Sequence, residues 1–486
     1  MVPESRPLRD AAAPAGPLRL HTATRTIGAG RDFEFEILAS NGAPLSAGCT
    51  LDFPGFTPTG RSGPGRWCGR LPRPGFYPLQ FSADPAGPSA RGSDYFIVPE
   101  PRPAAASPET GYYVFLGCGD YPIITGRETH DLAGWTLAQW QDLVAWMGAQ
   151  GMNRLWVLLN GYTLAYPSQR YPELCDRHAR NASENFLGQL IDCGHAHGVK
   201  TYLMLTTDGH GRDFVRAHPE AARLTRDGQP GEQHGLALEH PLTQRYLFDV
   251  LDEVLTLYPE ADGIAVHPTE SDPDRYNPET LAAFHAETGG DLHTAPKPER
   301  YAWYNRAFAR FLARFGARAR AHRGDLDLVM ANCWWQDAYV AINHAGLPPE
   351  WRVAVWYYGW EDTVPQPWPL HQWTETFGAN RILFMPTSQS FLFPEDPAQI
   401  MTRHIGTDRL VSTAALLGVR NIVYFAGWEI LAEASRLLDL AIVRQPTLSA
   451  PATNAPTLRT RLYEDYFGLR HDRLTTMTGA GQTPPL

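Results

Sequence analysis

The sequence lacks the features that mark several large classes of protein. No apolar run reaches membrane-spanning length, and the first residues lack the basic-then-apolar layout of a secretory signal. Lysine and arginine are not in excess: the formal net charge is -10, whereas a phosphate-binding protein normally shows a basic face. We therefore expect a soluble protein, cytoplasmic unless a signal has been removed, with neither membrane nor nucleic acid among its partners. The composition leaves a homo-oligomer open.

Cysteine is also scarce. The six cysteines are spread too widely for a zinc-ligand pattern. Cys49 and Cys68 could pair within the N-terminal region, but free thiols in a reducing cytoplasm are the favoured interpretation. We expect neither a bound metal nor a cofactor.

The residues that are present indicate two domains. A chain of 486 residues exceeds one typical domain, and a hydrophobic content of 43% allows a sizeable core. Residues 17 to 100 read as short strands separated by glycine and proline, with no helical period. We predict a sandwich-like β-domain over residues 1–100 and a proline- and alanine-rich linker over residues 101–111.

From residue 112 onward, apolar strand-like segments alternate with helix-like segments. The strand-like segments are "YYVFLGCGD", "NRLWVLLNG", "VKTYLMLTTD", "DGIAVHPTE", "LDLVMANCWW", "RVAVWYYGWED", "RILFMPTSQS" and "RNIVYFAGWE". Helices are expected to end near Gly151, Gly198 and Gly418. The pattern predicts a (β/α)8 TIM barrel over residues 112–443, with a C-terminal helix and a frayed tail over 444–486. A doubly wound open sheet is the alternative, although "GCGDYP" matches its Gly-rich phosphate turn only in part.

Aromatic and polar side chains gather where these strands are expected to end, which in such barrels is the catalytic face. Indole and phenol rings can stack on the C–H faces of a sugar, while carboxylates, amides and imidazoles bind its hydroxyls. Any single ring could instead cap the barrel core, but their number favours a carbohydrate site. The predicted substrate-binding residues are Asp120, Asn160, Tyr162, Asp208, His210, His267, Asn332, Trp334, Trp335, Trp356, Tyr358, Trp360, Trp428 and Glu429.

The motif "HPTESD" ends the fourth strand and supplies a candidate general acid. Cleavage of a glycosidic bond needs a protonated carboxylic acid beside the leaving oxygen and a second carboxylate. We predict that Glu270 is the acid, because desolvation behind a buried strand would raise its pKa. Asp272 is a further catalytic candidate, whereas we expect Asp274 to be a solvated loop residue.

The second carboxylate is less well defined. Glu361 and Asp362 follow the sixth strand, and at most one of them points inward if the strand alternation continues. Glu429 and Asp208 are the alternatives. The seventh strand carries no carboxylate in "RILFMPTSQS", which favours an inverting or substrate-assisted mechanism over the common retaining arrangement.

Three segments resemble TIM-barrel glycoside hydrolases that have an N-terminal β-domain: "MNRLWVLLNGYTLAYPSQRYPEL", "HPLTQRYLFDVLDEVLTLYPEADGIAVHPTESD" and "LYEDYFG". The pattern is architectural and covers most of residues 112–470. It is similar to the α-glucuronidases, which implies Glu270 as acid and Glu361 or Asp362 as base. It is more distantly similar to the β-N-acetylhexosaminidases, although these carry an Asp-Glu pair where this chain has Thr269 before Glu270. The resemblance implies an exo-acting glycoside hydrolase of no sharply defined family.

Two other functions stay open. His267 and Glu270 lie three apart, and Asp208 and His210 two apart, so a metal-dependent barrel hydrolase or isomerase is one alternative. A catalytically silent carbohydrate-binding protein is the other, since it would keep the tryptophans without needing an acid.

Overall fold

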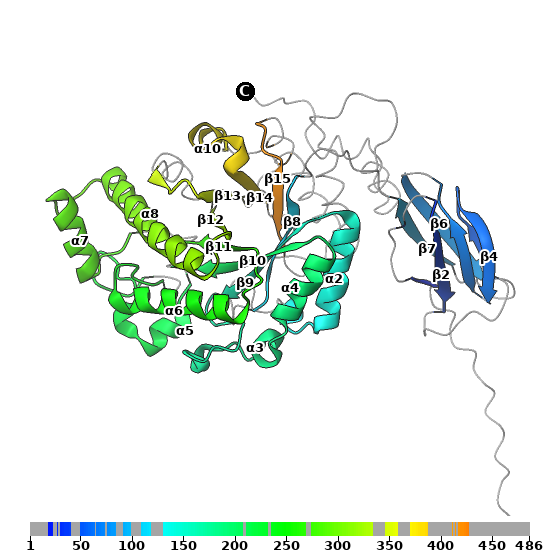
Figure 1. Cartoon of the computed structure of the whole chain (residues 1–486), viewed down its shortest axis with the longest axis horizontal. Coiled ribbons are helices and arrows are strands. Elements are labelled where there is room, and N and C mark those ends of the chain that lie inside the picture. The colour runs from blue at the N-terminus through cyan, green and yellow to red at the C-terminus, as the bar shows by residue number, and fades with distance from the viewer. Residues whose placement is uncertain are drawn as a thin grey trace, which may run out of the picture. The chain divides into compact units, whose positions relative to one another are not determined.

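The structure is a computed structural model. It describes residues 18–22, 27, 30–39, 49–63, 65–72, 75–83, 91–98, 108–117, 130–207, 210–231, 235–268, 274–333, 346–357, 370–386, 411, 414 and 417–426. These residues belong to two compact units, one built of antiparallel sheets and one built of strands and helices (Figure 1). The predicted C-terminal helix and tail over 444–486 lie outside the described residues.

The N-terminal unit contains two antiparallel sheets, with strand orders β1-β2-β5-β4 and β3-β6-β7. Their strands are β1 (Arg19–His21), β2 (Asp32–Leu38), β3 (Cys49–Asp52), β4 (Thr57–Gly63), β5 (Arg66–Arg70), β6 (Gly75–Ala83) and β7 (Arg91–Val98). Buried and exposed residues alternate along β2, so one face of its sheet turns inward. Phe35 and Trp67 from one sheet share a core with Phe81 and Phe96 from the other, which confirms the predicted sandwich-like domain. The thiol of Cys68 is free.

The second unit is a closed barrel of eight parallel strands. The strands are β8 (Thr110–Phe115), β9 (Arg154–Asn160), β10 (Lys200–Thr206), β11 (Gly263–His267), β12 (Asp327–Cys333), β13 (Trp351–Tyr357), β14 (Ile382–Pro386) and β15 (Asn421–Phe425). Each pairs with its sequence neighbour, and β15 pairs with β8 to close the ring. The predicted (β/α)8 barrel is confirmed, and the doubly wound sheet is wrong because this sheet has no free edge.

Helices lie between the barrel strands. They are α1 (His130–Ala133), α2 (Leu137–Gln150), α3 (Arg180–Glu184), α4 (Leu187–Ala196), α5 (Arg212–Ala217), α6 (Pro241–Leu257), α7 (Pro278–Thr288), α8 (Lys297–His322) and α10 (Leu370–Phe377), with short 3-10 turns at Pro172–Leu174, Pro219–Ala221 and Ala379–Arg381. The Thr136 and Gln139 side chains form a capping box at the start of α2. Gly151, Gly198 and Gly418 all have positive φ, as the predicted helix ends require. None of the helices in the described part of the chain has the length and apolarity of a membrane span.

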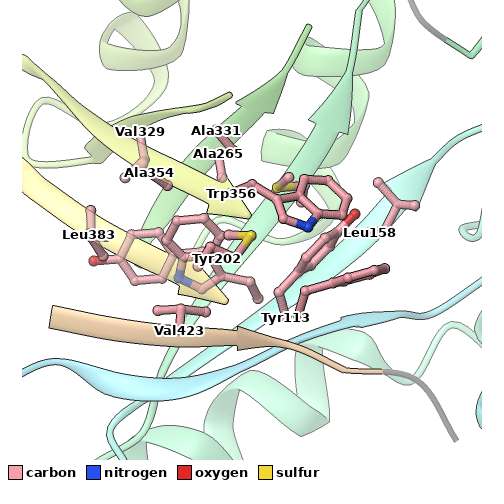
Figure 2. Packing of buried hydrophobic residues seen from close by; sticks show 14 residues of the cluster. Tyr113, Leu158, Tyr202, Ala265, Val329, Ala331, Ala354, Trp356, Leu383 and Val423 are labelled. Atoms are coloured by element: carbon pink, nitrogen blue, oxygen red, sulfur yellow. The ribbon is translucent and has the colours of Figure 1, made fainter. Parts of the chain in front are cut away.

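Aromatic side chains and alanines pack together in the barrel interior (Figure 2). The Trp356 ring lies 5.6 Å from that of Tyr113 and 4.5 Å from that of Phe425, between ring centroids. Three neighbouring strands contribute alanine to the same interior, namely Ala265, Ala331 and Ala354. Because cores are filled at nearly crystalline density, these small side chains leave the volume that the rings occupy.

The amino-terminal end of the barrel is held by a network of charges. The Glu109 carboxylate, just before β8, accepts hydrogen bonds of 2.9 Å from Arg154 on β9 and 2.9 Å from Arg352 on β13. Arg352 also donates to Asp327 on β12 at 2.8 Å, and Tyr202 on β10 donates to the same carboxylate. Burial opposes ionisation of Glu109, but the two guanidinium groups outweigh it and hold the pKa of that carboxyl below its usual value.

We expect Glu109→Gln to lower the free energy of unfolding by about 3 kcal/mol, because it leaves two guanidinium groups facing a neutral amide. Urea denaturation measures this change. Glu184→Gln, in the exposed Arg180–Glu184 pair, is the control and should cost less than about 0.5 kcal/mol. Since the pKa of Glu109 is lowered by folding, its contribution is present above the unfolded pKa of about 4.3 and is lost as the pH falls through the lower folded value. Equal losses in the two variants at pH 7 would contradict the network.

Candidate active site

The described residues include part of the predicted site, at or just beyond the carboxyl ends of the barrel strands. These residues are Asn160, Tyr162, His210, His267, Asn332 and Trp356, and all are buried. The remaining predicted site residues lie outside the described residues, namely Asp120, Asp208, Glu270, Asp272, Trp334, Trp335, Tyr358, Trp360, Glu361, Asp362, Trp428 and Glu429.

His267 is the last residue of β11 and is 1% exposed. Its ring packs against the Trp356 indole, with ring centroids 4.9 Å apart, and its Nδ1 lies 3.3 Å from the carbonyl oxygen of Ala331 on β12. Burial lowers the pKa of His267 to about 4, although the carbonyl favours the charged form. The imidazole is therefore neutral at pH 7. Because a carbonyl only accepts hydrogen bonds, Nδ1 carries the proton and Nε2 carries the lone pair.

A second neutral histidine lies beside the first. The His210 ring stacks on that of His267 with centroids 5.9 Å apart, and the Tyr162 ring meets His210 edge-on at 5.7 Å. The Arg212 guanidinium carbon lies 4.7 Å from the centroid of the Tyr162 ring. Burial, together with the nearby His267 and Arg223, lowers the pKa of His210 to about 3. The site thus presents uncharged imidazoles with cationic groups close by.

Asn160 uses its side chain to join two strands. Its amide nitrogen donates to the Thr206 carbonyl at 3.0 Å, and the Thr206 N–H donates to its amide oxygen at 2.8 Å. The next residue, Thr207, donates its backbone N–H to the carbonyl oxygen of His267 at 3.0 Å. These bonds fix the ends of β9, β10 and β11 relative to one another. A contact between Asn160 and a substrate stays a prediction.

Trp356 faces the barrel interior. It is 1% exposed and belongs to the buried cluster that fills the barrel (Figure 2), and its ring contacts that of His267. The predicted contact of this indole with a sugar stays a prediction, while its packing role is evident.

One expectation for the loop after β11 is wrong. Asp274 is not a solvated loop residue, because its carboxylate forms a bidentate ion pair with Arg300 of α8 at 2.6 and 3.1 Å. No local pattern indicates this partner, because it lies 26 residues further along the chain.

Two arginines of this region were not among the predicted site residues. Arg212 covers the Tyr162 ring, and Arg223 lies close enough to lower the pKa of His210. Arg212 could have been predicted from its position, because it lies two residues after His210 in the segment that follows the third barrel strand.

Among the described residues, no group of three or more His, Cys, Asp or Glu residues lies close enough together to hold a metal ion.

No family model matches the chain, and no curated protein sequence matches it either. Solved structures similar to it include a β-N-acetylhexosaminidase, with 14% identity and a TM-score of 0.50 over 77% of this chain and 78% of that one. A β-galactosidase from the psychrophilic Marinomonas ef1 has 12% identity and a TM-score of 0.48 over 76% of this chain and 62% of that one. A β-N-acetylhexosaminidase from Bacteroides fragilis NCTC 9343 has 12% identity and a TM-score of 0.45 over 78% and 71%. At 14% identity, the similarity to the first β-N-acetylhexosaminidase shows a shared fold. The resemblance to α-glucuronidases stays a prediction.

We expect His210 and His267 to remain neutral at pH 5.5, where histidines of the urea-unfolded chain, with a pKa near 6.5, are mostly protonated. Nitrogen-15 NMR of the imidazoles distinguishes the two forms and reports the proton on Nδ1 of His267. Because folding lowers both pKa values, the unfolded chain binds more protons below pH 6.5, so stability falls from pH 6.5 toward pH 4. A charged imidazole at either position at pH 5.5 would contradict the buried arrangement.

Proposed function

We propose that this chain is an exo-acting glycoside hydrolase in which Glu270 is the general acid and Glu361 or Asp362 is the base. The observation that carries the proposal is the buried, neutral His267, packed on Trp356 at the carboxyl end of β11. Glu270 follows His267 by three residues. In (β/α)8 enzymes the chemistry lies at this end of the strands, so the placement is that expected of an acid after strand four.

The described rings suit a polyhydroxylated substrate. A neutral imidazole with its proton on Nδ1 can accept a hydrogen bond from a sugar hydroxyl at Nε2, and its neutrality persists well below pH 7. Tyr162 and His210 place further polar aromatic groups beside it. The barrel fold, shared with a β-N-acetylhexosaminidase, is compatible with this activity but also supports many others, so the proposal depends on the site.

The sequence after β14 bears on the mechanism. This strand ends at Pro386 and is followed by Thr387, Ser388 and Gln389, none of which is a carboxylate. We therefore favour inversion: the acid protonates the leaving oxygen as its bond to the anomeric carbon breaks. The base takes a proton from the water that attacks the opposite face. A substrate-assisted mechanism is less favoured, because Thr269 stands where an acetamide-orienting aspartate would precede the acid.

A metal-dependent hydrolase is the second candidate. It is favoured by the two neutral imidazoles, whose centroids lie 5.9 Å apart, because neutral histidine is the form that binds a metal. The third candidate is a carbohydrate-binding protein without catalysis.

We expect Glu270→Gln to lower kcat about 10²-fold or more on the glycoside that the wild type cleaves, with binding retained, because the amide cannot protonate the leaving group. A panel of chromogenic uronates, N-acetylhexosaminides and neutral hexosides identifies that glycoside. Glu260→Gln is the control, since Glu260 is an exposed carboxylate in the turn before β11, at the opposite end of that strand. Unchanged hydrolysis in Glu270→Gln would remove the assigned acid.

The same assay separates the alternatives. Activity that survives exhaustive chelation excludes the metal-dependent hydrolase, whereas binding of glycosides without hydrolysis indicates the silent carbohydrate-binding protein. NMR of the first product anomer distinguishes inversion from retention.

A further inference from the structure

We propose that Asp176 is a positioning residue for Tyr162 and, through the Tyr162 ring, for the contact of that ring with His210. In this role Asp176 governs substrate recognition without touching the substrate. The inference rests on the proposed function, because Tyr162 and His210 matter here as predicted substrate-binding residues. Each residue on the path from Asp176 to His210 belongs to the part of the chain that the structure describes.

Tyr162 lies at the apex of a tight turn that follows β9. Asn160, the last residue of β9, forms an isolated antiparallel bridge with Leu164, so the chain reverses direction with three residues between them. Inside the turn, the Gly161 N–H donates to the carbonyl oxygen of Thr163 at 3.0 Å. The placement of the Tyr162 side chain therefore depends on how both sides of this short turn are held.

Asp176 holds the returning side of the turn at two points. Its carboxylate oxygen Oδ2 accepts the hydroxyl of Thr163 at 3.0 Å, and its backbone N–H donates to the carbonyl oxygen of Leu164 at 2.7 Å. The other carboxylate oxygen accepts the N–H of His178 at 2.8 Å, which orients the carboxylate itself. Asp176 is 3% exposed, so these hydrogen bonds form away from bulk water, where they are electrostatically stronger.

The segment after β8 packs against the same carboxylate. A Cβ atom at Gly117, two residues after β8, would lie 3.1 Å from Oδ2 of Asp176 and 2.5 Å from Cβ of Ala179. In an interior packed this closely, a side chain has little room to take another position. The Asp176 carboxylate is therefore confined by packing as well as by its hydrogen bonds.

The Tyr162 ring connects the turn to the two neutral histidines. It meets the His210 ring edge-on with centroids 5.7 Å apart, and the Arg212 guanidinium carbon lies 4.7 Å from its centroid. His210 in turn stacks on His267. Tyr162 is 5% exposed, so these neighbours enclose its ring. A shift of the turn therefore changes the position of the Tyr162 ring relative to His210.

Groups that recognise a substrate depend on supporting hydrogen bonds that hold them within about 0.5 Å of the productive geometry. Loss of the bond between Thr163 and Asp176 releases one of the two points at which the turn is held. The side chains of Tyr162 and His210 stay chemically unchanged. We therefore expect weaker recognition from substitutions at residues that are not themselves predicted to contact the substrate.

The test uses Asp176→Ala and Thr163→Val, with Asp262→Ala as the matched control. The Asp262 carboxylate likewise pairs with one backbone N–H and one side chain, those of Thr201 at 2.8 Å and His195 at 3.0 Å. Asp262 immediately precedes β11, so it lies at the opposite end of the barrel strands. We expect similar decreases in melting temperature in the two Asp→Ala variants. Thr163→Val removes a single hydroxyl, and it keeps the test possible if Asp176→Ala does not fold.

The first measurement is the proton NMR spectrum of the His210 imidazole, whose signal is identified by its absence from His210→Gln. Because the Tyr162 ring lies edge-on to His210, displacement of that ring alters the ring-current shift of the imidazole protons. We expect these shifts to change in Asp176→Ala and in Thr163→Val but not in Asp262→Ala.

The second measurement is kcat/KM on the glycoside that the wild type cleaves. In Asp176→Ala and Thr163→Val it should fall roughly tenfold, the equivalent of one hydrogen bond to the substrate. The fall should come mainly from KM, because recognition is affected and the general acid is not. Asp176→Asn should restore both measurements, since its amide oxygen can accept the His178 N–H while its amide nitrogen donates to the Thr163 hydroxyl.

The outcomes separate this inference from the proposed function. His210 shifts that match the wild type in both test variants, or that change equally in Asp262→Ala, overturn the positioning role and leave the proposed function standing. Changed shifts with wild-type kcat/KM overturn the role in recognition alone. If Glu270→Gln keeps wild-type activity, the proposed function fails and the role in recognition fails with it. Selective changes in both measurements, reversed in Asp176→Asn, support the inference.

Discussion

Closure of the barrel is the constraint on which the rest of this unit depends. Pairing of β15 with β8 removes both edges of the parallel sheet and brings all eight carboxyl ends to one face. At the opposite face, Glu109 links the start of the first strand to Arg154 and Arg352 on two others. This network joins strands that are far apart in the sequence. By holding the amino-terminal ends of these strands together, it also helps to set the positions of their carboxyl ends.

The barrel interior changes chemistry along its axis. Toward its amino-terminal end, Trp156 and Tyr202 stack with ring centroids 5.4 Å apart. At the carboxyl end lie His267 and His210, whose imidazoles are kept neutral by burial. Histidines held without charge are compatible with a compact core and can still form directional hydrogen bonds. At this boundary the neutral His267 ring lies directly against Trp356, one of the side chains that fill the core.

The insertion between β11 and β12 gives the barrel a separate support. Helices α7 and α8 enclose a cluster that includes Phe284, Trp303 and Tyr304. Aromatic rings fill this cluster, and the Arg275 guanidinium, which is ion-paired with Glu239, lies over its Tyr304 ring. The residues after the fourth strand, Asp274 and Arg275, are thereby bonded to Arg300 and Tyr304 of α8, a helix of 26 residues.

Local sequence patterns were sufficient to predict the type and order of the barrel strands. Buried parallel strands are continuous apolar runs, and glycines with positive φ mark helix ends, so both are local signals. The directions of the side chains and their partners, by contrast, depend on contacts between distant segments. The Asn160 amide bonds to Thr206, and Trp356 packs in the core. The Tyr304 hydroxyl bonds to the backbone of Arg275, 29 residues away in the sequence. Such contacts depend on which strands and helices become neighbours after closure, and no local pattern encodes that.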